Sequence, residues 1–287
     1  MIATEKWLAA SAAAFRASDG RSGVADLLHY NARFCEWGGG QPIVLVPGLA
    51  GGFDLLGPLA RELAKRYHVI SYHLRGEDDC FALRRRFGLR DLVDDLREFI
   101  SWFGLERPIV CGVSFGGVLA LEYAAAYPRH IQAVGVQGVG GRYERGLVQR
   151  IASLVLSGYP LPPNSPFVNQ FFNLLFGGRQ ARPVFEFVTR QCWQTDQSVM
   201  AHRLHLVERC DLGPQLARVT VPACVLAGER DLLVSPASLE ELAAGLPDGY
   251  GELLPRCGHL AFVTHSQLVA ARFHTFFQGA ARSSAAR

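Results

Sequence analysis

The sequence predicts an α/β fold in which a mostly parallel sheet carries helices on both faces. Short apolar runs typical of buried strands alternate with longer amphipathic segments as far as residue 138, and again from residue 212 onward. Between these stretches, residues 139–211 hold no convincing strand and are rich in proline and aromatic residues. Such alternation favours a parallel sheet covered on both sides. Residues 1–138 and 212–287 are therefore predicted to form one core, with a mostly helical cap inserted at 139–211.

The first half of the chain supplies most of the predicted sheet. A strand pair is expected within Asp26–Trp37, which ends at three consecutive glycines. Four apolar runs then predict strands, at Ile43–Val46, His68–Tyr72, Pro108–Cys111 and Ile131–Val136. Helical spacing of apolar residues predicts the helices between them, at 54–67, 89–103 and 118–126.

The remaining elements follow from the same patterns. Within the insertion, helices are expected at Val168–Phe176 and Pro183–Cys192. Strands at Pro222–Gly228 and Tyr250–Leu254 then alternate with helices at 236–246 and 266–277. Residues 279–287 are small and polar, which favours a frayed tail. The apolar stretch around residues 7–15 follows Glu5 and only one lysine, which favours an N-terminal helix over a signal peptide.

Composition excludes several classes of function. The net charge of +3 is too small to indicate a nucleic-acid partner, and no apolar run approaches the ~20 residues of a membrane span. The seven cysteines include no Cys-x-x-Cys pair, and several lie in apolar runs, so reduced thiols in the cytoplasm are expected. His202 and His205 have a spacing that could seat a metal, but without a nearby Glu or Cys they are interpreted as a helix face.

The motif Gly112–Gly117, with sequence GVSFGG, contains the candidate nucleophile, Ser114. It follows a buried strand and precedes a helix, which is the context of a nucleophile elbow. Glycines permit the tight turn, and the turn projects the Ser114 hydroxyl at the positive end of a helix dipole. The alternative is a glycine-rich turn with an incidental serine.

A serine nucleophile needs a base and an acid that orients the base. Asp231 and His259 each follow a predicted strand of the second half, so their loops lie at the same sheet edge as Ser114. Their chain order, serine then acid then histidine, is the order expected for this architecture. Main-chain N–H groups of Phe115 and Leu49 are predicted to stabilise the oxyanion. Cys111 and Cys257 are expected near the site as packing residues.

With these residues, the chain resembles the α/β-hydrolase superfamily, in particular its single-domain members with a helical cap inserted after the sixth strand. The resemblance rests on the elbow, Gly228–Asp231, Cys257–His259 and the pair Arg75-Gly76. Two positions depart from the pattern. Pro47 stands where a histidine normally braces the oxyanion loop, and His73 stands where the family often has an aspartate.

The resemblance implies an enzyme that hydrolyses a carboxylic ester through an acyl-enzyme on Ser114, without metal or cofactor. The aromatic residues of the insertion suggest a small to medium apolar substrate. Family members with this pattern also include thioesterases, acyltransferases, perhydrolases and carbon–carbon bond hydrolases. A different class of function, a small-molecule sensor with a partner protein on the cap, stays open. The serine argues against epoxide hydrolases and dehalogenases, which use an aspartate nucleophile.

Overall fold

The computed structural model describes residues 20–77, 85–142 and 166–285, together with residues 146, 150, 151, 153 and 156. The described strands are β1 (Arg21–Asp26), β2 (Asn31–Gly38), β3 (Pro42–Val46), β4 (His68–Tyr72), β5 (Ile109–Val113), β6 (Val134–Gln137), β7 (Ala223–Gly228) and β8 (Gly249–Leu254). The described helices are α2 (Gly52–Ala64), α3 (Leu89–Trp102), α4 (Phe115–Ala126), η1 (Pro128–His130), α6 (Pro166–Phe176), α7 (Arg182–Cys192), α8 (Gln197–Glu208), α9 (Gly213–Leu216), α10 (Pro236–Gly245), α11 (Ala261–Thr264) and α12 (Ser266–Ala285).

The described strands form one sheet in the order β1-β2-β4-β3-β5-β6-β7-β8. Strands β4, β3, β5, β6, β7 and β8 run parallel, and β2 joins β4 antiparallel with β1 at the edge. The central strands are apolar along their length because both of their faces are covered, and every residue of β5 is buried. The predicted α/β fold class is therefore confirmed.

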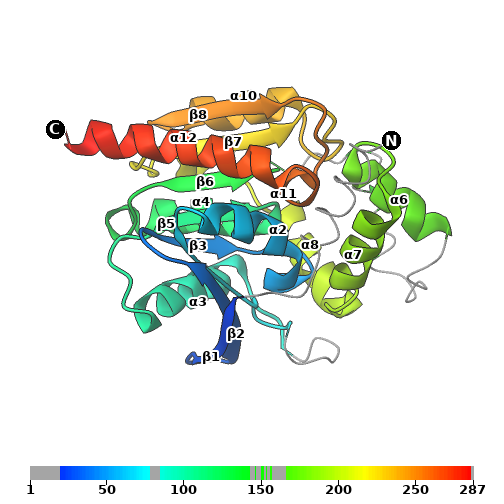
Figure 1. Ribbon diagram of the computed structural model, residues 1–287, viewed down its shortest axis with the longest axis horizontal. Helices are drawn as coiled ribbons and strands as arrows, with labels where there is room; N and C mark the ends of the chain where they lie inside the picture. Colours follow the sequence, from blue (N-terminus) through cyan, green and yellow to red (C-terminus); the bar gives the residue numbers. More distant parts are fainter. Residues whose placement is uncertain are drawn as a thin grey trace.

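Two hydrophobic cores lie on opposite faces of this sheet. Helices α3, α4 and α10 pack on one face, and α2, α11 and α12 pack on the other (Figure 1). The amphipathic pattern of α3 shows why: Leu92, Leu96 and Phe99 are buried on its inner side. The helices on these two faces do not cover the carboxyl ends of the parallel strands.

Helices α6, α7 and α8, here called the inserted helices, lie beyond the carboxyl ends of the parallel strands (Figure 1). The chain leaves the sheet after β6 and returns in β7. The departing and returning segments meet where Leu212 N–H donates to the carbonyl of Gly141 at 2.9 Å, beside an isolated bridge between Arg142 and Asp211. The inserted helices thus connect to the sheet through two adjacent chain segments.

Element boundaries depart from the sequence predictions at both ends of the chain. The strand pair predicted within Asp26–Trp37 begins earlier, because β1 runs from Arg21 and pairs along its whole length with β2. The predicted frayed tail is wrong up to Ala285, since α12 continues eight residues beyond Phe277. Ala280, Ala281 and Arg282 are strong helix formers, and they extend a helix already anchored by the buried side chain of Phe277.

The N-terminal helix predicted around residues 7–15 lies outside the described residues. Within the described part of the chain, no helix combines the length and apolar character that crossing a bilayer requires.

Candidate active site

Ser114 forms the junction between β5 and α4. Its backbone has φ 49° and ψ −120°, a conformation that residues with a side chain rarely adopt. The flanking glycines make this turn possible. A Cβ on Gly116 would overlap the carbonyl oxygens of Val46 and Pro47, and one on Gly112 would overlap the carbonyl oxygen of Gly116. The glycine spacing of the motif is thus a requirement of close backbone packing.

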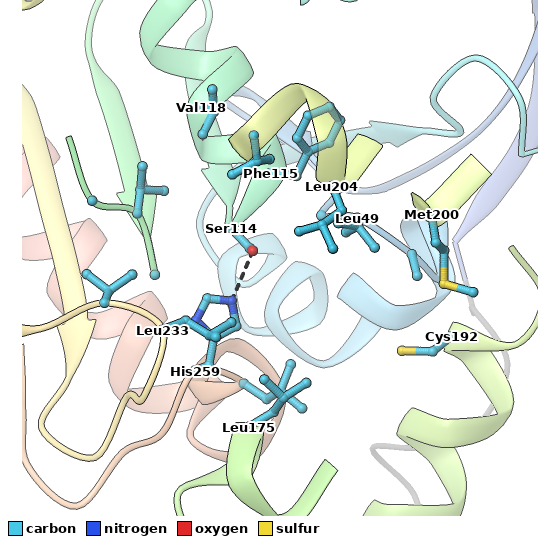
Figure 2. Close-up of a pocket in the computed structure, with 18 of the residues that line it drawn as sticks. Leu49, Ser114, Phe115, Val118, Leu175, Cys192, Met200, Leu204, Leu233 and His259 are labelled. Carbon is cyan, nitrogen blue, oxygen red and sulfur yellow. Dashed lines mark hydrogen bonds between the residues drawn. The ribbon is translucent and has the colours of Figure 1, made fainter. Parts of the chain in front are cut away.

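The structure brings Ser114, His259 and Asp231 into one hydrogen-bonded chain. His259 Nε2 lies 2.9 Å from Ser114 Oγ (Figure 2), and His259 Nδ1 lies 2.8 Å from Asp231 Oδ2. An ionised carboxylate can only accept, so the Asp231 contact assigns the ring proton to Nδ1 and leaves Nε2 to accept from the serine hydroxyl. His259 and Asp231 are both buried.

Asp231 is fixed by the loop after β7. Its Oδ1 accepts main-chain N–H groups from Leu233 at 2.8 Å and Val234 at 3.2 Å. One carboxylate oxygen is therefore occupied by backbone donors, and the other is left for His259. This arrangement combines the turn-forming role of an aspartate with the orientation of a histidine.

Gln137 and Gly138, at the end of β6, connect the serine to the histidine loop. The main-chain carbonyl of Gln137 accepts from Ser114 N–H at 2.8 Å, and its side-chain amide donates to the carbonyl of His259 at 3.1 Å. Gly138 has φ 71°, and a Cβ there would lie 3.0 Å from His259 Cε1. Neither residue was among the predicted site residues. A buried glutamine at a strand end followed by glycine is the signal that could have found them.

Leu49 and Phe115 lie beside Ser114, as their positions in the chain imply (Figure 2). Phe115 is the first residue of α4, where a helix leaves the N–H without an intrahelical partner. Leu49 follows Gly48, which packs against the elbow: a Cβ on Gly48 would lie 3.4 Å from the carbonyl oxygen of Val113. Both backbone segments therefore border the hydroxyl.

An apolar cavity of about 230 Å³ opens onto Ser114 and His259 (Figure 2). It lies between the sheet edge and the inserted helices. Few polar or charged side chains line the cavity, and most of its wall is formed by apolar side chains. The apolar lining includes Leu49, Leu55, Phe115, Val118, Val139, Val168, Phe171, Phe172, Leu175, Trp193, Met200, Leu204, Leu212, Leu233, Leu260 and Phe262.

The cysteines that border the cavity are Cys192 and Cys210, which the sequence did not single out. Burial raises the pKa of each of these thiols to about 12. Cys111 and Cys257 are buried in the hydrophobic core, which confirms that they are packing residues, and burial raises the pKa of Cys257 to about 11. All four groups are therefore protonated at neutral pH and behave as small apolar side chains.

His202 and His205 do not point to a shared metal. His202 Nε2 lies 2.7 Å from the carbonyl oxygen of Phe87, while His205 lies beside Glu208 on the same helix. Within the described residues, no group of three His, Cys, Asp or Glu side chains could hold a metal ion.

Comparison with known proteins shows which family the chain belongs to. The model of the alpha/beta hydrolase fold matches residues 41–266. The chain is 27% identical over 256 residues to the pimeloyl-[acyl-carrier protein] methyl ester esterase of Stenotrophomonas maltophilia (strain R551-3), covering 84% of this chain and 95% of that protein.

Among solved structures, an esterase from Exiguobacterium antarcticum matches with a TM-score of 0.80 at 16% identity, covering 90% of this chain and 99% of that one. The enol-lactonase from Burkholderia xenovorans LB400 matches with a TM-score of 0.75 at 19% identity, covering 89% and 100%. These likenesses concern the fold. Since the family model spans most of the sequence, the chain belongs to the alpha/beta hydrolase fold family and is an enzyme with hydrolase activity.

Proposed function

We propose that this protein hydrolyses carboxylic esters with a small to medium apolar group, through an acyl-enzyme on Ser114. The observation that carries the proposal is the 2.9 Å contact between Ser114 Oγ and His259 Nε2 at the floor of an apolar cavity. The ester-cleaving activity named for the Stenotrophomonas relative supports the same class of reaction.

In the proposed mechanism, His259 Nε2 takes the hydroxyl proton while Ser114 Oγ attacks the ester carbonyl carbon. Asp231 stabilises the imidazolium through the contact at Nδ1. The carbonyl oxygen becomes an oxyanion, which the N–H groups of Leu49 and Phe115 stabilise. His259 then donates its proton to the alkoxide leaving group, and the carbon–oxygen bond of the ester breaks. A water molecule repeats these steps on the acyl-enzyme and releases the acid.

We also propose that residues 139–211 form a cap that selects the substrate. The paired segments at Gly141–Arg142 and Asp211–Leu212 support these boundaries, because the chain crosses from core to insertion there. The inserted helices supply Phe172, Met200 and Leu204 to the cavity wall. Each methylene group buried in such a wall contributes about 0.8 kcal/mol, so an apolar acyl or alcohol group binds favourably.

The proposed location is the cytoplasm, supported by the free thiols of Cys35, Cys111, Cys192, Cys210, Cys224 and Cys257. The proposed partner is a small-molecule ester.

The test is turnover of p-nitrophenyl esters of increasing chain length, in parallel with thioesters and amides. We expect repeated turnover of esters, and no measurable turnover by Ser114→Ala. Labelling with a p-nitrophenyl phosphonate, followed by peptide mass spectrometry, should place the phosphonyl group on Ser114. A Ser114→Ala variant as active as the wild type would overturn the site. A single slow turnover with ligand-induced stabilisation would instead indicate a sensor, and preference for thioesters a thioesterase.

A further inference from the structure

Arg203 is the largest fully buried side chain among the described residues, and it lies on α8 of the inserted helices. Burying a guanidinium group is costly unless its N–H groups are paired. Its partners therefore indicate what the residue does. Among the described residues, the hydrogen-bond partners of its guanidinium group all lie in loops at the carboxyl edge of the sheet, and none lies in the inserted helices.

The guanidinium group joins two of these loops. Its Nη1 donates to the carbonyl oxygen of Leu49 at 3.0 Å and to Glu77 Oε1 at 2.8 Å. Its Nη2 donates to the carbonyl oxygens of Leu74 at 3.2 Å and Arg75 at 3.0 Å. Leu49 follows β3, whereas the other three residues follow β4. The planar fork of an arginine can serve such fixed acceptors together, which a lysine ammonium cannot.

Glu77 completes the arrangement. Its Oε2 accepts the N–H of Leu74 at 3.0 Å, so the carboxylate bridges Arg203 and the backbone of the loop after β4. Both side chains of this ion pair are almost wholly inaccessible, at 0% for Arg203 and 3% for Glu77. The pair is therefore held in one geometry.

A second bond from the insertion reaches the same oxyanion loop, here Gly48–Gly51. The N–H of Gly51 donates to Thr195 Oγ1 at 2.9 Å, and Thr195 is buried in the turn between α7 and α8. Pro47 offers no side-chain donor to this loop. The loop is thus hydrogen-bonded to the insertion at two points: the carbonyl of Leu49 accepts from Arg203, and the N–H of Gly51 donates to Thr195.

We infer that Arg203, assisted by Thr195, is a positioning residue that sets the oxyanion loop for catalysis from the inserted helices. This inference rests on the proposed function. The carbonyl and N–H of Leu49 flank one Cα atom, so holding the carbonyl limits the directions in which the N–H can point. Met200 and Leu204 on the same helix face the cavity beside Leu49 (Figure 2). Helix α8 therefore carries both the side chains that line the cavity and the arginine that holds the backbone of Leu49.

The experiment compares three variants with the wild type. Thr195→Val removes one acceptor with little change of shape. Arg203→Lys keeps the charge and loses the fork. The double variant Arg203→Met with Glu77→Leu removes both buried charges, so that neither is left unpaired. Arg209→Met is the matched control, because Arg209 caps the same helix at the surface and, within the described part of the chain, its side chain contacts only the exposed His205.

We expect kcat for a p-nitrophenyl ester to fall about 10- to 100-fold in all three variants, with KM changed less than about threefold. Removing a whole oxyanion donor costs about 10²–10³ in kcat, so displacing one costs less. The rate of phosphonate labelling of Ser114 should fall by a similar factor. Arg209→Met should match the wild type in both measurements.

Thermal unfolding and circular dichroism establish that each variant is folded. The inference is overturned if folded variants keep wild-type kcat and labelling rates, or if only KM rises. Failure of the proposed function looks different, because then the wild type itself shows no ester turnover. In that case the labelling rates of Ser114 still compare the variants, since phosphonylation needs the same loop but no turnover.

Discussion

Asp231 divides its two carboxylate oxygens between the backbone and His259: Oδ1 accepts the N–H groups of Leu233 and Val234, and Oδ2 lies 2.8 Å from His259 Nδ1. The carboxylate cannot rotate without losing the backbone bonds. The imidazole is thereby held in one tautomer, with its Nε2 toward Ser114.

Asp231→Asn should lower kcat by about 10³–10⁴-fold while leaving the fold intact. The amide oxygen would keep the backbone donors, so its NH₂ group would face His259 Nδ1 and favour the wrong tautomer. Steady-state kinetics with a p-nitrophenyl ester measure the effect. Asp248→Asn, at an exposed position, is the control and should match the wild type. An Asp231→Asn enzyme within tenfold of wild-type kcat would contradict the role proposed for the acid.

Gly116→Ala should destabilise the elbow itself. The new methyl group would overlap the main-chain oxygens of Val46 and Pro47, which cannot move without displacing β3. We expect a loss of about 3 kcal/mol in the free energy of unfolding, measured by urea titration. Gly39→Ala is the comparison, because a Cβ there meets nothing within 4 Å, and it should cost less than about 0.5 kcal/mol. Equal stability of the two variants would show that close packing does not explain the elbow glycine.

The apolar cavity should produce a chain-length preference. We expect kcat/KM of the wild type to rise about fourfold for each added methylene group until the cavity is full, since each contributes about 0.8 kcal/mol. Met200→Trp should shift the preference to shorter esters and lower kcat/KM for the longest good substrate about tenfold or more. Leu232→Trp changes an exposed side chain and should leave the preference unchanged. A profile that does not depend on position 200 would argue against substrate binding along α8.

Thiol reagents should not inactivate the native enzyme near neutral pH. Burial raises the pKa of Cys192 and Cys210 to about 12, so at pH 8 only about 10⁻⁴ of either thiol is the reactive thiolate. Because the thiolate fraction grows as pH rises toward the pKa, the alkylation rate should increase about tenfold per pH unit. Iodoacetamide treatment followed by an activity assay and peptide mass spectrometry tests this. Denatured protein is the positive control, and rapid alkylation of either cysteine in the folded enzyme at pH 8 would refute the expectation.

The features that depend on residues close together in the sequence could be predicted from the sequence alone. The elbow around Ser114 and the loops that carry Asp231 and His259 each follow a strand that the sequence predicts, and parallel strands bring their carboxyl ends to one edge of the sheet. That Ser114, Asp231 and His259 lie at the same edge of the sheet could therefore be predicted without knowing any side-chain contact. The roles proposed for these residues rest on the geometry described above.

Features that depend on distant contacts escaped prediction. Arg203 and Glu77 are 126 positions apart, and nothing near either residue indicates its partner. The side-chain amide of Gln137 donates to the carbonyl of His259, which lies 122 positions further on. Cys192 and Cys210 reach the cavity because the inserted helices fold over it, whereas proximity in sequence to the site motifs had suggested Cys111 and Cys257. The extent of α12 was missed because small residues fit a helix as well as a tail.

The order of β6 and β7 in the chain has a consequence for biosynthesis. These strands are neighbours in the sheet, yet the ribosome makes the whole insertion between them. A nascent chain ending before β7 holds Ser114 but neither Asp231 nor His259, so the hydrogen-bonded chain of these three residues cannot yet form. During that interval the edge of β6 has no partner on its β7 side, a state prone to strand-to-strand association. Translation of β7 thus supplies the missing neighbour of β6 first, and His259 is made only after β8 has been added at the edge of the sheet.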